Sequence, residues 1–310
     1  MTRQTAALLV AFFSMLTTIA EVSADSLHVL KGRIIRSLAI DPADQSHVLV
    51  GQKGAKTGSA LIFQSLDGGK NWRTLNGNQP LHSKATDVQA VAIVSKEILL
   101  AGTWKHGLYR SSNGGKNFAK LANFPSQDIR DLQIKDGVIF AATGRDGVFA
   151  SSDLGGSWKA LGPKNDFLWS LTAMQEGLFA SSPEAGVFEM RSAAWDNIFH
   201  RDKAYAIAAH KTDQRWLAIA GETGLYATSG DGWRTFLAGE KFADVLILDD
   251  KYLLAASWSN GVSVLAVDGE EQKRLLGNQA VIHLQHADDQ LFAGSWGDGL
   301  HILPIADVLP

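Results

Sequence analysis

One stretch of eight residues, SLDGGKNW at 65–72, recurs along the chain. Close copies are SSNGGKNF at 111–118 and SSDLGGSW at 151–158, and a more divergent copy, SGDGWRTF, covers 229–236. The first serines of these copies lie 46, 40 and 78 residues apart, and 78 is close to two units of 39. A regular period of about 40 residues is the signature of a chain built from repeated supersecondary units.

A glycine followed by an apolar run gives the number of units. The spacings between these glycines are 40, 39, 38, 37 and 38 residues. The glycines are Gly107, Gly147, Gly186, Gly224, Gly261 and Gly299. An earlier unit contains Gly58 after an enlarged loop, which makes seven units in all.

The second unit shows the plan that the units share. It holds four short runs of apolar residues, at 88–94, 98–103, 107–111 and 118–121, separated by Gly, Asn, Asp and Ser. Such runs are typical of β-strands joined by tight turns. Four antiparallel strands repeated about an axis form a propeller blade, whereas a solenoid would need capped ends. The sequence therefore predicts an all-β, seven-bladed β-propeller.

The two ends of the chain are expected to meet in one blade. The last unit supplies strands at 282–285, 290–294 and 299–303 and ends without a fourth. The segment Leu27–Leu30 resembles the missing strand, and pairing it there would cover an exposed sheet edge. We predict that this segment completes the last blade within a single domain covering residues 25–310.

Composition and the N-terminus indicate an exported protein. A charged start at Arg3, an apolar stretch at 6–19 and small residues before Asp25 are typical of a signal peptide covering residues 1–24, cleaved near Ala24. We expect a periplasmic or secreted bacterial protein, with no stable membrane span once the signal is removed. The net charge of −3 argues against a nucleic-acid partner. Cys is absent, and we expect no cofactor, no metal ion and a monomeric state.

The repeated turn resembles the Asp-box, or BNR repeat, of sialidase-like propellers. An Asp side chain can accept hydrogen bonds from backbone N–H groups two residues on, glycine permits positive φ, and the closing aromatic ring can lie between blades. We therefore interpret four residues as structural: Asp67, Asn113, Asp153 and Asp231. Units four and six lack the motif, so plainer outer turns are expected there.

The whole mature chain is similar to single-domain, seven-bladed Asp-box propellers such as the photosystem II stability/assembly factor family. That family holds its partner on an arginine-rich face. The resemblance implies a binding or assembly role without catalysis. The candidates for such a face here are Arg33, Arg36 and Arg130.

Three loops between the second and third strands share a tryptophan. They read TWKHG at 103–107, SWSNG at 257–261 and SWGDG at 295–299. Because these loops surround the mouth of the channel in a propeller, Trp104, Trp258 and Trp296 are predicted to bind a protein or glycan partner there. The alternative is that each ring folds inward and packs between blades.

An enzyme is the alternative function. This chain resembles sialidases through its Asp-boxes. Sialidases use three arginines, a Tyr nucleophile assisted by Glu, and an acidic residue. Other glycosidases use two carboxylates. Xyloglucanase-type hydrolases are similar in their blades but pair two propellers around a cleft. Polar residues expected near the mouth are Arg33, Arg36, Lys84, Asp87, Asp128, Arg130, Arg145, Asp146, Asp166, Glu184, Glu222, Lys241 and Asp244. A glycoside hydrolase would place its carboxylates among them, with Asp87 and Asp244 as candidates.

Overall fold

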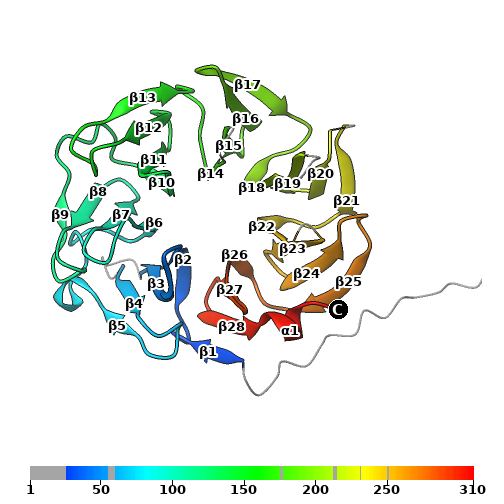
Figure 1. Cartoon of the computed structure of the whole chain (residues 1–310), viewed down its shortest axis with the longest axis horizontal. Coiled ribbons are helices and arrows are strands. Elements are labelled where there is room, and N and C mark those ends of the chain that lie inside the picture. Colours follow the sequence, from blue (N-terminus) through cyan, green and yellow to red (C-terminus); the bar gives the residue numbers. More distant parts are fainter. Residues whose placement is uncertain (1–25, 55–59, 175–176, 212–214, 231, 250) are drawn as a thin grey trace, which may run out of the picture.

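Seven four-stranded antiparallel sheets stand around a central axis in the computed structural model (Figure 1). The structure describes residues 26–54, 60–174, 177–211, 215–230, 232–249 and 251–310. The predicted signal peptide, Gly58 and Asp231 lie outside these ranges. The prediction of an all-β, seven-bladed propeller is confirmed, and the blades are numbered here from 1 to 7 along the chain.

Each blade runs from an innermost strand at the channel to an outermost strand at the rim of the disc. Blade 1 comprises β2 (Ile34–Asp41), β3 (Asp44–Lys53), β4 (Ile62–Ser65) and β5 (Arg73–Thr74). Blade 2 comprises β6 (Val88–Ile93), β7 (Leu99–Thr103), β8 (Gly107–Ser111) and β9 (Ala119–Lys120). Blade 3 comprises β10 (Ile129–Lys135), β11 (Val138–Thr143), β12 (Val148–Ser151) and β13 (Lys159–Gly162). A single 3₁₀ turn, η1 (Asn76–Asn78), follows β5.

The same order of strands continues through the second half of the chain. Blade 4 comprises β14 (Ser170–Ala173), β15 (Leu178–Ser182), β16 (Gly186–Arg191) and β17 (Ala194–Phe199). Blade 5 comprises β18 (Ala204–Lys211), β19 (Arg215–Gly221), β20 (Gly224–Thr228) and β21 (Arg234–Ala238). Blade 6 comprises β22 (Phe242–Leu248), β23 (Tyr252–Ser257), β24 (Val262–Ala266) and β25 (Glu271–Leu275). Blade 7 contains β26 (Val281–Ala287), β27 (Gln290–Ser295) and β28 (Leu300–Pro304).

Strand β1 (Leu27–Val29) is the outermost strand of blade 7 and closes the ring. It pairs antiparallel with β28, with Leu27 opposite Ile302 and Val29 opposite Leu300. Figure 1 shows the first and last strands of the chain side by side at this seam. The prediction that the N-terminal segment completes the last blade is therefore confirmed. The chain ends beyond β28 in one helical turn, α1 (Ile305–Val308).

The hydrophobic core is divided among the contacts between blades. The described residues form seven buried clusters, and each cluster joins two neighbouring blades. The cluster between blades 7 and 1 contains Ile35, Phe63 and Phe292, and Leu27 and Val29 of β1 pack against it. Stability is therefore approximately a sum over nearest-neighbour contacts, closed into a ring by β1.

The repeated outer turn is held by its serine and its acidic residue. The Ser65 hydroxyl donates to Asp67 Oδ1 (2.8 Å) and accepts the Gly69 N–H (2.8 Å). The Asp67 carboxylate accepts the backbone N–H of Asn71 (2.8 Å), which lies four residues on rather than the expected two. The Trp72 ring packs on the cluster between blades 7 and 1, and its Nε1–H donates to the Gly69 carbonyl (2.8 Å).

The second and third turns repeat this geometry. Asn113 Oδ1 accepts the Asn117 N–H at 3.0 Å, and Asp153 Oδ1 accepts the Ser157 N–H at 2.8 Å. Hydrogen bonds from the Ser157 hydroxyl and N–H hold the pKa of Asp153 at about 2. In all three turns the side-chain oxygen at this position accepts a backbone N–H from within its own turn, as local turn chemistry predicts.

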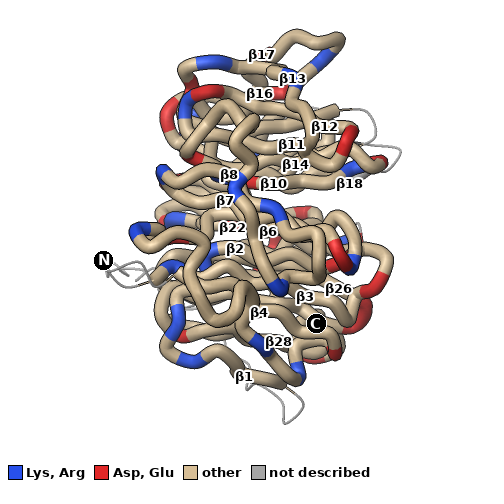
Figure 2. Tube along the Cα trace, turned by 90° about the vertical axis from the view of Figure 1, so that its left-hand side faces the viewer, with Lys and Arg blue, Asp and Glu red and all other residues tan. Residues whose placement is uncertain are grey.

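Charge is distributed over the disc rather than gathered in one basic strip. On the side drawn in Figure 2, Lys and Arg lie on both faces of the ring and are interspersed with Asp and Glu. Within the described ranges, no helix is long and apolar enough to cross a bilayer.

Candidate functional site: the rim of the central channel

Bulges near the start of the innermost strands supply one set of side chains, and three of these, Arg36, Gln89 and Arg130, lie at the channel mouth. In six of these strands the pairing with the second strand skips one residue. A bulge leaves one residue out of the ladder and re-aims its side chain. The skipped residues are Arg36, Gln89, Arg130, Tyr205, Ala243 and Ile282. Arg36 and Arg130 thus occupy corresponding places in blades 1 and 3.

The loops after the second strands supply the other set. Trp258, Trp296 and Trp104 directly follow β23, β27 and β7, in blades 6, 7 and 2. Lys53, the last residue of β3, takes the corresponding place in blade 1, and its Nζ lies 5.0 Å from the centre of the Trp296 ring. Four consecutive blades, 6, 7, 1 and 2, therefore each contribute one long side chain from the end of the second strand.

Three residues of the first set and all four of the second, together with Asp87 and Trp169, line an open cavity of about 250 Å³, here called the rim pocket. The Trp258 and Trp296 rings lie 5.5 Å apart at 54° to each other, and Trp104 and Trp296 remain 36% and 38% exposed. The residues that line the rim pocket are Arg36, Lys53, Asp87, Gln89, Trp104, Arg130, Trp169, Trp258 and Trp296. The structure thus places the three predicted tryptophans and two of the three predicted arginines around one cavity.

Arg33 is the predicted arginine that lies elsewhere. Its guanidinium lies over the Phe63 ring at 4.7 Å and donates to Gln52 Oε1 at 2.9 Å. Arg33 precedes β2, whereas Arg36 occupies the bulge inside it. The residue therefore packs within blade 1 and does not line the rim pocket.

Cations and aromatic rings alternate around the rim pocket. The guanidinium groups of Arg36 and Arg130 lie 5.0 and 5.6 Å from the centre of the Trp169 ring. Each such contact contributes about 0.5–2 kcal/mol, most where water is excluded. Burial lowers the pKa of Arg36 to about 10, so this group still carries its charge at neutral pH. The positive charge on the pocket wall is therefore largely withdrawn from bulk water.

Several polar atoms of the rim pocket are buried without a partner. Within the described part of the chain, no hydrogen bond reaches Trp258 Nε1, Arg130 Nε or Asp87 Oδ1. The other carboxylate oxygen of Asp87 lies 3.6 Å from Lys53 Nζ. An unsatisfied buried polar atom costs about 1–3 kcal/mol, so such atoms need a specific explanation. Because these atoms have almost no solvent-accessible surface, a bound molecule would supply the missing partners only together with a shift of the surrounding side chains.

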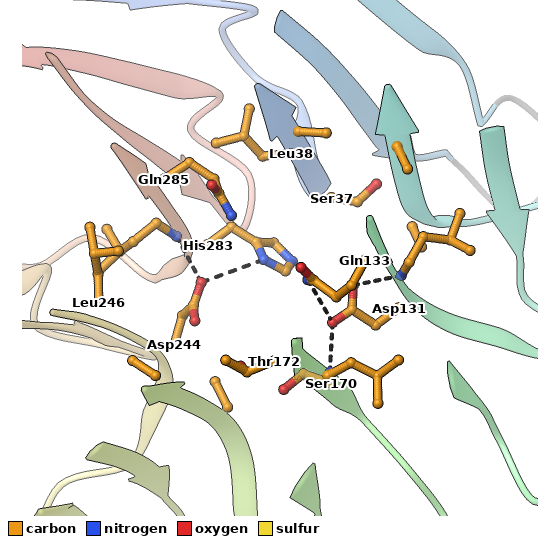
Figure 3. A pocket seen from close by; sticks show the side chains of 18 of the residues that line it. Ser37, Leu38, Asp131, Gln133, Ser170, Thr172, Asp244, Leu246, His283 and Gln285 are labelled. Atoms are coloured by element: carbon orange, nitrogen blue, oxygen red, sulfur yellow. Dashed lines mark hydrogen bonds and ion pairs between the residues drawn. The ribbon is translucent and has the colours of Figure 1, made fainter. Parts of the chain in front are cut away.

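A second cavity, the central channel of about 410 Å³, shares Arg36, Gln89, Arg130 and Trp169 with the rim pocket. It is lined by side chains of the innermost strands (Figure 3). Its acidic residues connect neighbouring blades. Asp131 of blade 3 accepts the Leu171 N–H of blade 4 at 2.8 Å.

Asp244 makes the same connection three blades further round the ring, between blades 6 and 7. It accepts the Leu284 N–H at 2.8 Å, and its carboxylate lies 3.8 Å from His283 Nδ1 (Figure 3). Burial raises the pKa of Asp131 to about 6 and that of Asp244 to about 7, and burial lowers the pKa of His283 to about 3. Asp244, expected near the mouth, therefore faces the channel and holds blades 6 and 7 together.

These shifts predict how stability depends on pH. Because the pKa of Asp244 is higher in the folded protein than in the unfolded chain, the folded state binds more protons between about pH 4 and pH 7. The contribution of Asp244 to stability should therefore fall as the pH rises through this interval, whereas that of His283, whose pKa is lowered to about 3, should rise up to about pH 6.5. Thermal unfolding from pH 4 to 8 measures the net slope, and Asp244→Asn should remove the falling contribution and make the slope more positive. An identical slope in the variant would contradict the assignment.

Tyr205, Glu222 and Lys241 form a further cluster beside the channel. The Tyr205 hydroxyl donates to Glu222 Oε2, and Lys241 Nζ lies 3.0 Å from the same oxygen. Lys241 also lies over the rings of Tyr205, at 4.6 Å, and Trp258, at 5.4 Å. Burial raises the pKa of Tyr205, while the hydrogen bond from Tyr205 lowers the pKa of Glu222. Lys241 thus connects Trp258 of the rim pocket to Tyr205 of blade 5.

No family model and no curated protein matches this sequence. Among solved structures, YCF48 bound to D1 peptide superposes with a TM-score of 0.72 at 13% identity and covers 93% of this chain and 99% of its own. YCF48 from Cyanidioschyzon merolae gives 0.67 at 13% identity, over 91% and 98% of the two chains. The GH74 xyloglucanase from Xanthomonas campestris gives 0.62 at 15% identity, over 84% of this chain and 50% of the enzyme. At these identities the likeness shows the β-propeller fold and no more.

Proposed function

We propose that this protein is a non-catalytic binding scaffold that holds an acidic segment of a protein partner in the rim pocket. The unpartnered polar atoms in an aromatic, cationic cavity are the observation that carries the proposal. We further propose that residues 1–24 are a signal peptide and that the propeller, residues 25–310, acts in the periplasm or outside the cell as a monomer. The solved structure of YCF48 with a D1 peptide supports a peptide ligand on this fold.

The chemistry of the rim pocket selects the ligand. Arg36, for which no ion pair is seen in the described part of the chain, favours a carboxylate. Arg130 already pairs with Asp128 (2.7 Å), and Lys53 lies 3.6 Å from Asp87. Trp258 Nε1 lacks an acceptor. The exposed faces of Trp104 and Trp296 suit apolar side chains, because large aromatic rings at a rim are typical interface anchors. A segment that pairs Asp or Glu with a neighbouring apolar residue satisfies both requirements, and one of its backbone N–H groups would have to supply the donor that Asp87 Oδ1 lacks.

Replacement of all three tryptophans tests the proposal. The triple variant Trp104→Ala, Trp258→Ala, Trp296→Ala should weaken binding to acidic peptides on an array at least about tenfold, because hot-spot side chains contribute about 2 kcal/mol or more each. A matched control removes two exposed leucines of the outer turns, Leu66 (57% exposed) and Leu154 (41%). Both variants should keep the β-sheet circular dichroism spectrum.

The outcomes separate the possible ligands. Peptide binding that survives the triple substitution would reject the rim pocket as the site. Binding to acidic oligosaccharides on a glycan array in place of peptides would reject the protein partner and identify a glycan. The native partner, recovered by pull-down from periplasmic extract, should follow the same pattern across the variants.

A sialidase-like hydrolase is the second candidate function. The Tyr205–Glu222 pair favours it, because the resemblance implies a Tyr nucleophile assisted by Glu, and Arg36 and Arg130 lie nearby around Trp169. The third arginine of the resemblance is missing from this group, since Arg33 stacks on Phe63. A panel of fluorogenic glycosides and sialosides discriminates the candidates. Turnover that is lost in Tyr205→Phe at unchanged melting temperature would favour the enzyme, and no turnover would favour the scaffold.

A further inference from the structure

Two histidines and one aspartate converge where β1 closes the ring. His28 of β1 and His301 of β28 are direct partners in the antiparallel pairing, and their rings stack at 4.2 Å with 15° between planes. Asp298, in the loop before β28, places Oδ2 2.9 Å from His301 Nε2 and 3.5 Å from His28 Nε2. The backbone carbonyl of Asp298 also contacts His28 Nε2. Four donor atoms from both ends of the chain thus face one small volume.

The spacing of these atoms suits a metal ion. One ligand atom from each of the three side chains lies within 4.8 Å of the others, and in the described part of the chain this is the one such group of three. Donors about 2.0–2.2 Å from a first-row ion lie roughly 3–3.5 Å apart. Two imidazoles with one carboxylate form a ligand set that Zn²⁺ and its neighbours prefer over Ca²⁺ or Mg²⁺.

The surroundings leave room for the ion to enter. The side chains of His28 and Asp298 are 31% and 37% exposed, whereas that of His301 is 10% exposed. A buried imidazole on the sheet therefore faces two ligands that solvent can reach. Because the stacked imidazoles direct their Nε2 lone pairs nearly parallel, the partly exposed His28 ring would have to turn out of the stack, with a rotation of Asp298, to bring the three donors to one ion. Water would complete a tetrahedral shell.

We propose that His28, Asp298 and His301 bind one divalent transition-metal ion of the Zn²⁺ class across the seam of the propeller. Because the ligands come from residues 270 positions apart, the ion ties the N-terminal strand to the last blade. An ion that binds only the closed ring stabilises it by mass action. The site is separate from the rim pocket and does not depend on the proposed ligand there.

The test uses the full-length chain purified without a histidine tag, stripped with EDTA and titrated with ZnCl₂ or CoCl₂. We expect one ion per chain by calorimetry and the visible absorption of tetrahedral Co²⁺. The melting temperature should rise by about 5 °C with zinc about 100-fold above its Kd. Asp298→Asn and His28→Gln should each reduce affinity at least about tenfold.

A second stacked histidine pair provides the control. His82 and His106 stack at 4.3 Å and 15°, and His106 Nε2 contacts the Lys84 carbonyl. The double variant His82→Asn, His106→Asn should bind zinc as the unaltered protein does. Melting in EDTA shows whether Asp298→Asn is folded without metal. The proposal is overturned by the absence of saturable zinc and cobalt binding, or by equal affinity in the folded Asp298→Asn variant.

Discussion

A chain that begins at Gly32 should fail to form a stable, monomeric propeller, whereas one that begins at Ser26 should form it. The shorter chain lacks β1, so the outer edge of β28 loses its backbone partners. Leu27 and Val29 no longer cover the cluster between blades 7 and 1. Loss of this pairing and burial should cost about 3–5 kcal/mol, a large part of the stability of a typical domain. Urea unfolding and size-exclusion chromatography measure the two effects.

The missing strand can be returned separately. A synthetic peptide covering residues 25–31 should pair with β28 and restore the melting temperature of the short chain, because an exposed strand edge accepts an added strand. A peptide of the same composition in scrambled order should not. Without peptide, we expect oligomers joined through the open edge. A monomeric short chain with unchanged unfolding would show that β1 contributes nothing to closure.

The fold could be predicted from the sequence because its determinants are local and repeated. The predicted strand at 107–111 coincides with β8, since Gly107 must open it, and the fourth strand at 118–121 contains β9. The seam was predictable because the last unit lacked one strand and Leu27–Leu30 matched it. The sequence predicted that the Asp67 side chain accepts a backbone N–H two residues on. The donor is instead the N–H of Asn71, four residues on, because the turn contains more residues than an Asx turn.

The candidate site was only partly predictable because it depends on register between blades. Three tryptophans carried a shared motif, but Lys53 fills the same place in blade 1 without any sequence likeness to them. Trp169 lies outside the shared loop motif, and two guanidinium groups lie over its half-buried ring in the rim pocket. Arg33 was grouped with Arg36, although the two residues differ in place: Arg33 packs within blade 1, and Arg36, three positions further along the chain, occupies a bulge at the channel.

Gly186→Ala should destabilise the protein by about 4 kcal/mol. Gly186 opens β16 with φ of +89°, and an added Cβ would lie 1.8 Å from the carbonyl oxygen of Phe199. The ring of Phe199 is 1% exposed within the cluster between blades 4 and 5. Relief of the clash must therefore move β17 and the interface behind it. In blades 3 to 7 the glycine at the start of the third strand lies close to the backbone at the end of the fourth strand. This close contact explains why the repeat has a glycine at the start of the third strand.

The comparison with Gly137→Ala separates the clash from backbone strain. Gly137 has φ of +75°, and no described heavy atom lies within 4 Å of the position that an added Cβ would take. Strain alone should cost about 1 kcal/mol there. Urea unfolding of both variants at one pH gives the difference directly. Equal losses would mean that positive φ alone selects these glycines, and a loss several times larger at Gly186 would mean that contact between strands of a blade selects them.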